Sequence, residues 1–350
     1  MKSAADCLRA IREYSGPPLR FMEVCGTHTD SIFRSGLRDV LPETIRLISG
    51  PGCPVCVTPG GYIGAACRLS REDNNVLCTF GDMMRVPGTA GSLAEARAQG
   101  GRVRIVYSPM EVLDLAEKAP DLTFYMTAVG FETTLPIYAL MLEEMCRRNI
   151  KNVRFLTAVK AILPALRWIC AGGHAIDGFI GPGHVSAIIG ADAYREISGD
   201  FGVPVAVAGF EYEHLAAALW DLVNQCRAGS AAVHNLYPNV VTPSGNTAAL
   251  TLIDKYFVKA DTAWRGLGVI EGSGYVLRPA FAEYSAGDWD ADSDISEPPG
   301  CLCGSVIIGA SAPTDCPFFG TRCTPLDPVG PCMVSAEGAC GIYYRNRERL

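Results

Sequence analysis

The stretch GPGCPVCVTP, residues 50–59, is the part of the sequence around which the rest of the chain is best understood. It follows the apolar segment 45–49, which has the pattern of a buried strand. Its glycines and prolines predict a stiff, sharply turned loop, because proline cannot occupy a helix interior without breaking it. Loops that follow the strands of parallel sheets are where such sheets bind their ligands.

Cys53 and Cys56 stand in this loop in C-x-x-C spacing, which lets two sulfur atoms meet in a disulfide or on a shared metal. Three interpretations are open: a redox dithiol, half of a metal site, or a structural pair. In thioredoxin the motif opens a helix, whereas here we expect the prolines to prevent a helix from beginning at Cys53. We favour the redox dithiol.

Apolar segments alternate with amphipathic segments along most of the chain. We expect strands at 19–24, 45–49, 75–80, 103–107, 122–129, 153–157 and 175–180. Helices of about ten residues are expected between most of them. This alternation predicts βαβ units, and therefore α/β architecture with parallel sheets.

Two loops of the sequence resemble each other. An apolar strand followed by Gly-Pro-Gly and a chemically active side chain occurs at 47–53 and again at 178–184. The segment 77–82 is similarly echoed at 206–211. We infer two related α/β domains, residues 1–120 and 121–233. Residues 234–350 form a third part, in which an acidic, turn-rich segment precedes a cysteine-rich tail.

Composition and charge argue against several classes of protein. A net charge of -7 and a pI near 5.3 argue against nucleic acid as the main partner. The sequence has no apolar run of about 18 residues and no signal-peptide pattern, so we expect a cytoplasmic protein with no membrane partner. Dinucleotide-binding, Walker and serine-hydrolase motifs are also absent from the sequence.

Fifteen cysteines are unusual for a chain expected in a reducing compartment. Several suit small buried positions, but six lie in the Gly- and Pro-rich tail. These are Cys301, Cys303, Cys316, Cys323, Cys332 and Cys340. Zinc sites usually use close cysteine pairs, whereas iron–sulfur clusters accept widely spaced cysteines from irregular backbone. The spacing favours a 4Fe–4S cluster over zinc or no metal, and it does not select four ligands from the six.

Five further candidate residues follow expected strands. Cys25 suits a soft thiolate ligand of low-spin iron or copper, and His28 suits a proton acceptor or a group that supports the metal ligand. His184 follows the second Gly-Pro-Gly, at the position that a cysteine has in the first. Glu132 and Glu211 each follow a Gly-Phe pair at a strand end. Each of the five also has a plainer interpretation as a turn or surface residue.

Together, these motifs resemble those of the HypD family of hydrogenase maturation proteins over essentially the whole chain. The matching motifs are FMEVCGTHT (21–29), GPGCPVCVTP (50–59), GFETT (130–134), GPGHVS (181–186), GFE (209–211), WRGLG (264–268) and GPCMVSAEGAC (330–340). Several separate motifs in the same order make the resemblance highly specific.

The resemblance implies two similar α/β domains and a smaller third domain with a 4Fe–4S cluster. The family's cluster pattern falls here on Cys301, Cys316, Cys323 and Cys340. Cys25 would be a ligand of iron. Cys53 and Cys56 would form the thiol–disulfide pair that passes electrons between the cluster and the iron site.

The resemblance also implies a function and partners. Proteins of the family help to build the Fe(CN)2(CO) unit of nickel–iron hydrogenases in a complex with the small chaperone HypC. HypE, which carries a cyanide group made with HypF, donates to that complex. We therefore expect a redox-active assembly scaffold. The alternatives are a stand-alone iron–sulfur thiol–disulfide oxidoreductase and a zinc-stabilised interaction module.

Overall fold

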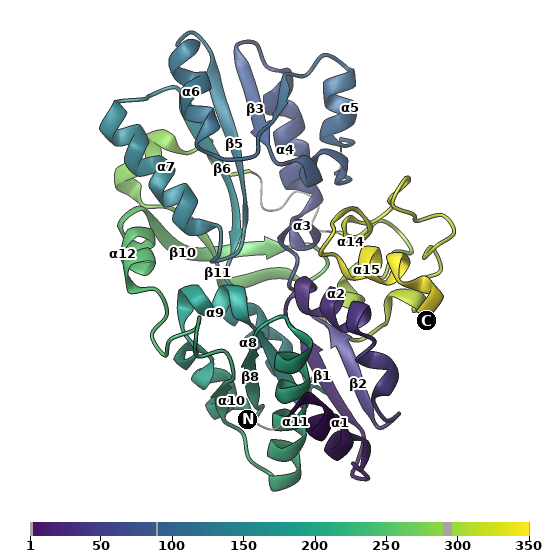
Figure 1. The fold of residues 1–350 in the computed structure, drawn as a ribbon. Helices are drawn as coiled ribbons and strands as arrows, with labels where there is room; N and C mark the ends of the chain where they lie inside the picture. The colour runs from purple at the N-terminus through teal and green to yellow at the C-terminus, as the bar shows by residue number, and fades with distance from the viewer. Residues whose placement is uncertain (1–2, 89, 290–295, 350) are drawn as a thin grey trace.

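Two sheets form the centre of the structure, and the cysteine-rich C-terminal part lies beside them (Figure 1). The computed structural model describes residues 3–88, 90–289 and 296–349. A five-stranded sheet has the order β2-β1-β7-β8-β9, and a six-stranded sheet has the order β10-β11-β6-β5-β3-β4. The expected α/β class with a cysteine-rich C-terminal part is confirmed.

The seven strands expected from apolar patterning are present, with bounds that differ from the expected ones by up to three residues, and β8 to β11 were not expected. The five-stranded sheet contains β1 (Leu19–Glu23), β2 (Ile45–Ser49), β7 (Gly178–Pro182), β8 (Val205–Ala208) and β9 (Val233–Asn235). The six-stranded sheet contains β3 (Asn75–Thr79), β4 (Val103–Ile105), β5 (Thr123–Gly130), β6 (Val153–Lys160), β10 (Phe257–Trp264) and β11 (Gly268–Leu277).

Helices cover the sheets and connect their strands. They are α1 (Ala4–Arg12), α2 (Gly26–Ser35), α3 (Pro54–Val57), α4 (Gly60–Arg71), α5 (Leu93–Ala98), α6 (Glu111–Lys118), α7 (Leu135–Arg148), α8 (Ile162–Ala171), α9 (Gly183–Ile189), α10 (Arg195–Phe201), α11 (Tyr212–Ala228), α12 (Thr247–Tyr256), α13 (Cys303–Ile307), α14 (Pro331–Val334) and α15 (Ala339–Arg345). In the described parts of the chain, none is long and apolar enough to cross a membrane.

The five-stranded sheet is parallel throughout, and its inner strands are buried on both faces. All residues of β7 and β8 are buried. Apolar side chains of α1, α2 and α11 pack together with residues of β1 and β8. Continuous apolar strands of this kind are stable only where other elements cover both faces, because a one-sided sheet would leave half of them in water.

The sheets do not follow the domain boundaries inferred from the sequence. β1 and β2 pair with β7, β8 and β9, although the sequence division assigned these strands to different domains. The proposed boundary after residue 120 falls between β4 and β5 of one sheet. The first Gly-Pro-Gly follows β2, and the second ends β7 and begins α9. β2 and β7 flank β1 on either side. Strand pairing depends on hydrogen bonds between segments that are far apart in the sequence, so the apolar pattern within one segment does not predict its partner strand.

The region after residue 234 also divides differently from the expectation. Strands β10 and β11 form an antiparallel hairpin that joins the six-stranded sheet through β6. The cysteine-rich segment that begins at Cys301 is therefore the smaller third part. It packs beside α2 and α3 through α14 and α15 (Figure 1).

A short helix occupies the place where the prolines were expected to prevent one. Cys53 has extended backbone and caps α3, whose first residue is Pro54. The backbone N–H of Cys56 donates to Cys53 Sγ at 3.2 Å. Proline is tolerated at the first helical position, because the N–H that it lacks would have no partner inside the helix. The expectation that no helix begins at Cys53 is wrong for this reason.

A half-buried ion pair, in which Glu23 is fully buried and Arg38 is partly exposed, connects the C-terminal helix to the five-stranded sheet. Arg38 Nη2 lies 2.8 Å from Oε1 of Glu23, a fully buried residue of β1. Arg38 Nη1 donates to the hydroxyl of Tyr343 in α15 at 2.8 Å. The Arg38 guanidinium also lies 4.8 Å from the ring centroid of Phe33 in α2. One side chain thus holds three separate elements together.

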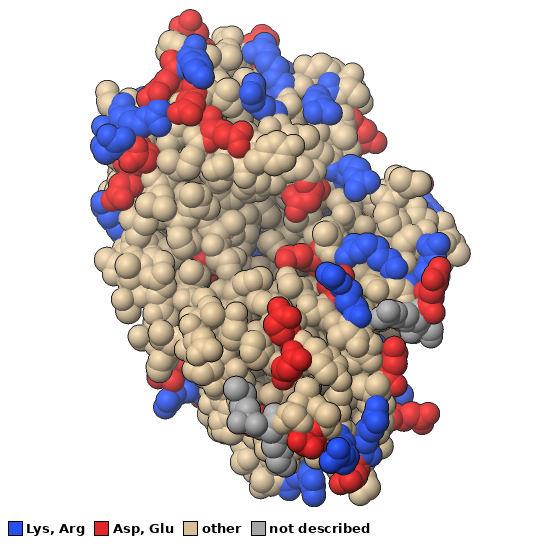
Figure 2. Space-filling view, viewed as in Figure 1, with Lys and Arg blue, Asp and Glu red and all other residues tan. Residues whose placement is uncertain are grey.

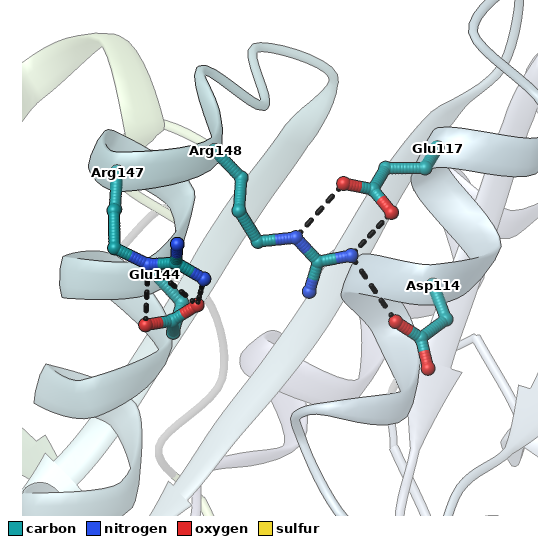
Figure 3. Close-up of polar contacts among 5 residues, drawn as sticks. All are labelled: Asp114, Glu117, Glu144, Arg147 and Arg148. Carbon is teal, nitrogen blue, oxygen red and sulfur yellow. Dashed lines mark hydrogen bonds and ion pairs between the residues drawn. The ribbon is translucent and has the colours of Figure 1, made fainter.

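Exposed ion pairs join the helices on the outer side of the six-stranded sheet (Figure 3). Arg148 at the end of α7 binds Glu117 and Asp114 of α6. Arg147 and Glu144 form a pair within α7. Pairs of this kind add little to stability, because water already solvates both charges well.

We expect the substitution Arg38→Met to destabilise the protein by about 3–5 kcal/mol, because it leaves the buried Glu23 carboxylate without its counter-charge. Urea denaturation measures this change. The double variant Glu23→Met/Arg38→Met should recover much of the loss, and Arg147→Met at the exposed pair should have a far smaller effect. Equal effects of Arg38→Met and Arg147→Met would contradict the role of the pair.

Candidate active site between the two sheets

A pocket of about 260 Å³ lies where the carboxyl ends of the two sheets face each other. Figure 2 shows the molecule hollowed between its upper and lower halves. From the five-stranded sheet the lining consists of Cys25, Gly52, Pro54, Val55, His184 and Val185. From the six-stranded sheet it consists of Phe80, Asp82, Met83, Val129, Gly130, Phe131, Thr133 and Thr134, and the tail adds Glu337. Parallel sheets bind ligands at this edge.

Cys25 lies at the end of β1 and immediately before α2, with 8% of its surface exposed. The disulfide loop packs directly on its backbone. A Cβ atom at Gly52 would lie 2.5 Å from Cys25 Cα and 1.9 Å from the carbonyl oxygen of Val24. Only glycine allows two segments of backbone to approach each other this closely. The CGTH and GPGC motifs therefore form one packed unit.

The tail joins this unit from the other side. A Cβ atom at Gly26 would lie 2.1 Å from the carbonyl oxygen of Glu337. The hydroxyl of Thr27 donates to Glu337 Oε1 at 3.0 Å. Burial raises the pKa of the Cys25 thiol, and the negative charge of Glu337 raises it further. Sequence reasoning missed Glu337 as a pocket residue, although it lies within the motif GPCMVSAEGAC.

Cys53 and Cys56 form a disulfide. Both cysteines are buried, with exposed fractions of 4% and 1%. The other two residues of the C-x-x-C motif, Pro54 and Val55, line the pocket that contains Cys25. The two cysteines instead line a small cavity on the other side, together with Cys332 of the tail. The loop thus lines the pocket through Pro54 and Val55 and lines the small cavity beside the tail through its two cysteines.

All six tail cysteines line one small apolar cavity, whose other lining residues are Leu302, Phe319, Gly330 and Met333. In residues 3–88, 90–289 and 296–349 no three His, Cys, Asp or Glu side chains converge to hold a single metal ion. Cys303 is hydrogen-bonded to Cys301 and Cys332, and Cys332 to Cys340, so these thiols lie side by side along the wall of the cavity. A set of thiols from loops and short helices around an apolar space suits the ligands of an iron–sulfur cluster.

Cys303 and Cys332 occupy the inner side of this cavity. They are the most deeply buried of the six, with exposed fractions of 2% and 1%. Cys332 also lines the small cavity beneath the disulfide. The sequence left both residues unassigned, and the structure places Cys332 between the other tail cysteines and Cys53–Cys56.

His28 is fully buried and does not line the pocket. Its Nε2–H donates to the carbonyl oxygens of Gly209, at 3.1 Å, and Ala208, at 3.3 Å. Burial lowers the pKa of His28 to about 4, so the imidazole is neutral near neutral pH. His28 therefore holds the end of β8, and this position offers little support for the proton-acceptor role.

His184 does line the pocket, and Phe210 links it to His28. The Phe210 ring centroid lies 4.1 Å from that of His184 and 4.7 Å from that of His28. The hydrogen bonds of His28 fix the turn that carries Phe210, and Phe210 packs on the exposed imidazole of His184. Two motifs that looked independent in the sequence are thus parts of one stack.

The two glutamates expected at the site lie outside the pocket lining. Glu132 is buried, and its Oε1 accepts from the Ile162 N–H at 2.9 Å, whereas its Oε2 has no hydrogen-bond partner among the residues that the structure describes. Burial raises the pKa of Glu132 to about 7. Glu211 is an exposed residue at the start of α11. Asp82, Thr133 and Thr134 are pocket residues that sequence reasoning did not single out.

Comparison with known proteins gives matches along nearly the whole chain. A family model described as "HypD: Hydrogenase formation hypA family" matches residues 2–347. The hydrogenase maturation factor HypD of Escherichia coli is 44% identical over 336 residues, which are 95% of this chain and 90% of that protein. HypD of Azotobacter vinelandii is also 44% identical, over 93% of this chain and 88% of its own length. A putative hydrogenase expression/formation protein of Methanocaldococcus jannaschii is 40% identical, over 99% and 97%.

The raised pKa of Glu132 predicts a pH-dependent stability. Between pH 4.5 and about 7 the folded protein keeps a proton on Glu132 that the unfolded chain has lost. Stability from this group is therefore full below that range and falls as the pH rises through it. Glu132→Gln mimics the protonated carboxyl and keeps an acceptor for the Ile162 N–H.

We expect Glu132→Gln to gain stability relative to the unmodified protein as the pH rises through this range. Urea denaturation of both proteins below, within and above the range measures the difference, and groups common to both cancel. A difference that does not change with pH would show that the carboxyl titrates normally.

Proposed function

The chain belongs to the HypD family of hydrogenase maturation factors, and from that premise we propose that it is a scaffold for assembly of the Fe(CN)2(CO) unit of nickel–iron hydrogenases. The iron unit is the cargo of the protein. The observation that carries the proposal is the position of Cys25, which lines the pocket between the sheets and has the disulfide loop packed on its backbone.

Cys25 is the proposed iron ligand. Cyanide and carbon monoxide stabilise low-spin Fe(II), and a soft thiolate suits such a metal. The pocket is large enough for a small iron unit and opens between the two sheets, where a second protein can supply further ligands. Asp82, Glu337 and His184 are the polar side chains at hand to position incoming groups.

Cys53 and Cys56 are the proposed electron store beside this pocket. Opening their disulfide consumes two electrons and two protons and leaves two thiols, and closing it returns both. The disulfide lies in the loop whose Pro54 and Val55 line the pocket. Electrons can thus be delivered next to the iron without exposing the sulfur atoms to it.

Cys301, Cys316, Cys323 and Cys340 are the proposed ligands of a 4Fe–4S cluster, which would supply electrons singly. The lining of the cavity fits such a group, because it consists of thiols and apolar residues. Cys303 and Cys332 are left out of the ligand set, because they lie on the inner side and Cys332 also reaches the disulfide cavity.

A HypC-type chaperone and a HypE-type cyanide donor, with HypF upstream, are the proposed partners. Hydrogenase maturation factors act with other maturation proteins, and the opening of the pocket between two sheets gives a second protein access to Cys25. A HypC-type partner would complete the coordination of the iron at this opening.

Two cysteine substitutions separate the iron site from the cluster. We expect Cys25→Ala to abolish the CN and CO infrared bands of the complex with the chaperone and to keep the visible absorption that dithionite bleaches. Cys323→Ala should lose that absorption. The complexes are made by co-expression with the other maturation factors and purified without oxygen.

Cys146→Ser is the control, because Cys146 is an exposed cysteine on α7. It should keep the infrared bands and the visible absorption. If the Cys25→Ala variant matured hydrogenase normally, Cys25 could not be the iron ligand. A complex of unmodified proteins that lacks CN and CO bands but reduces disulfides would favour the stand-alone oxidoreductase.

A further inference from the structure

The motif WRGLG, residues 264–268, has no part in the proposed chemistry so far. It forms the tight turn of the β10–β11 hairpin, in which Trp264 pairs with Gly268 and the Leu267 N–H donates to the Trp264 carbonyl. Gly266 and Gly268 have φ angles of +74° and +89°, in the region that favours glycine. The turn carries Arg265 into the interior, where its exposed fraction is 3%.

Arg265 is hydrogen-bonded to the end of α3, the short helix that contains Cys56 and is capped by Cys53. Its backbone N–H donates to the Val57 carbonyl at 2.9 Å, and its Nε donates to the Thr58 carbonyl at 2.8 Å. These residues end and follow α3, so Cys56 is one residue before the first of the two carbonyls. The guanidinium also donates through Nη2 to the Pro87 carbonyl at 2.9 Å.

The neighbouring residue of the same turn touches the cysteine-rich segment. A Cβ atom at Gly266 would lie 3.1 Å from Cα of Gly304 and 2.9 Å from Oε1 of Glu297. Gly304 directly follows Cys303 at the start of α13. The hairpin turn therefore contacts both α3, which contains Cys56, and α13, which begins at Cys303.

We propose that Arg265 is a positioning residue that holds the Cys53–Cys56 helix against the cysteine-rich segment and favours the reduced form of the pair through its buried positive charge. The inference rests on the proposed redox use of these cysteines. Reduction breaks the bond between the two sulfur atoms and adds two electrons, and any sulfur that does not take up a proton carries negative charge. The guanidinium is bonded to the carbonyl two residues after Cys56, and a buried cation stabilises a new negative charge in its vicinity, because few water molecules screen it. The Glu297 carboxylate, on which the charge of Arg265 also acts, offsets part of this effect.

The test is the equilibrium between Cys53–Cys56 and dithiothreitol in the full-length protein. One protein disulfide opens as the reagent closes its own, so electrons and protons balance. After alkylation, trypsin releases the peptide 47–68, which contains Cys53, Cys56 and Cys67. Its mass reports one alkylated cysteine when the pair is oxidised and three when it is reduced. Equilibrium is approached from both the oxidised and the reduced side.

We expect Arg265→Met to lower the equilibrium constant for reduction at least about tenfold, which is a shift of about 30 mV to more negative potential for a two-electron couple. Arg265→Gln, which keeps a hydrogen-bond donor but not the charge, should shift it in the same direction. Arg265→Lys keeps the charge and should stay within about threefold of the unmodified protein. Arg154→Met is the control. Arg154 also donates to carbonyl groups, but it lies at the start of β6 and its partners, Lys151 and Val153, belong neither to the disulfide loop nor to the cysteine-rich segment.

Folded neutral variants with an unchanged equilibrium would overturn the proposal. If neither neutral variant folds, Arg265→Lys decides, because a tenfold shift in this charge-retaining variant would also overturn it. A pair that cannot be reduced in the unmodified protein would instead refute the proposed redox function, and the inference would fall with it.

Discussion

The contact of Gly52 with the backbone of Cys25 is the constraint on which the rest of the site depends. A side chain at Gly52 would overlap the carbonyl of Val24 and push the two loops apart. The same demand for close approach recurs at Gly26, where the tail reaches the start of α2. Three motifs from distant parts of the chain can therefore meet around one thiol, and none of the three has a position in the site without the other two.

The pocket also depends on how the chain passes between the sheets. Its walls come from the carboxyl ends of strands in both sheets, so neither sheet contains the site alone. The tail that completes it is fastened at a second point, where Arg38 joins Glu23 of β1 to Tyr343 of α15. A half-buried pair of this kind fixes geometry more than it adds stability, because desolvation offsets much of the attraction between the charges. Its value here is that it fixes the tail relative to the end of β1, which leads to Cys25.

Much of this arrangement could be predicted from local sequence, and the remainder could not. The strands expected at 45–49 and 75–80 coincide with β2 and, within one residue, with β3, because apolar periodicity and turn residues determine such elements locally. The pairing of β1 with both β2 and β7 was not predicted, since it depends on segments far apart in the sequence. The motif that contains Cys25 and His28 was expected at the site, but only the fold shows that Cys25 lines the pocket and that the imidazole of His28 binds the end of β8.

The burial of the disulfide bears on the choice between the two proposed redox functions, the assembly scaffold and the stand-alone oxidoreductase. Thiol–disulfide exchange requires a thiolate to approach one sulfur directly, and Cys53 and Cys56 are almost entirely covered. A protein that exchanged electrons with the thiols of other proteins would expose at least one of the two sulfur atoms, whereas a small dithiol such as dithiothreitol reaches a buried pair slowly, through local opening of the structure. Here the cysteines face a cavity that they share with Cys332, so the short route to them runs through the interior from the cysteine-rich segment. Such a route suits a scaffold that carries its own electron supply, and it weighs against a stand-alone oxidoreductase.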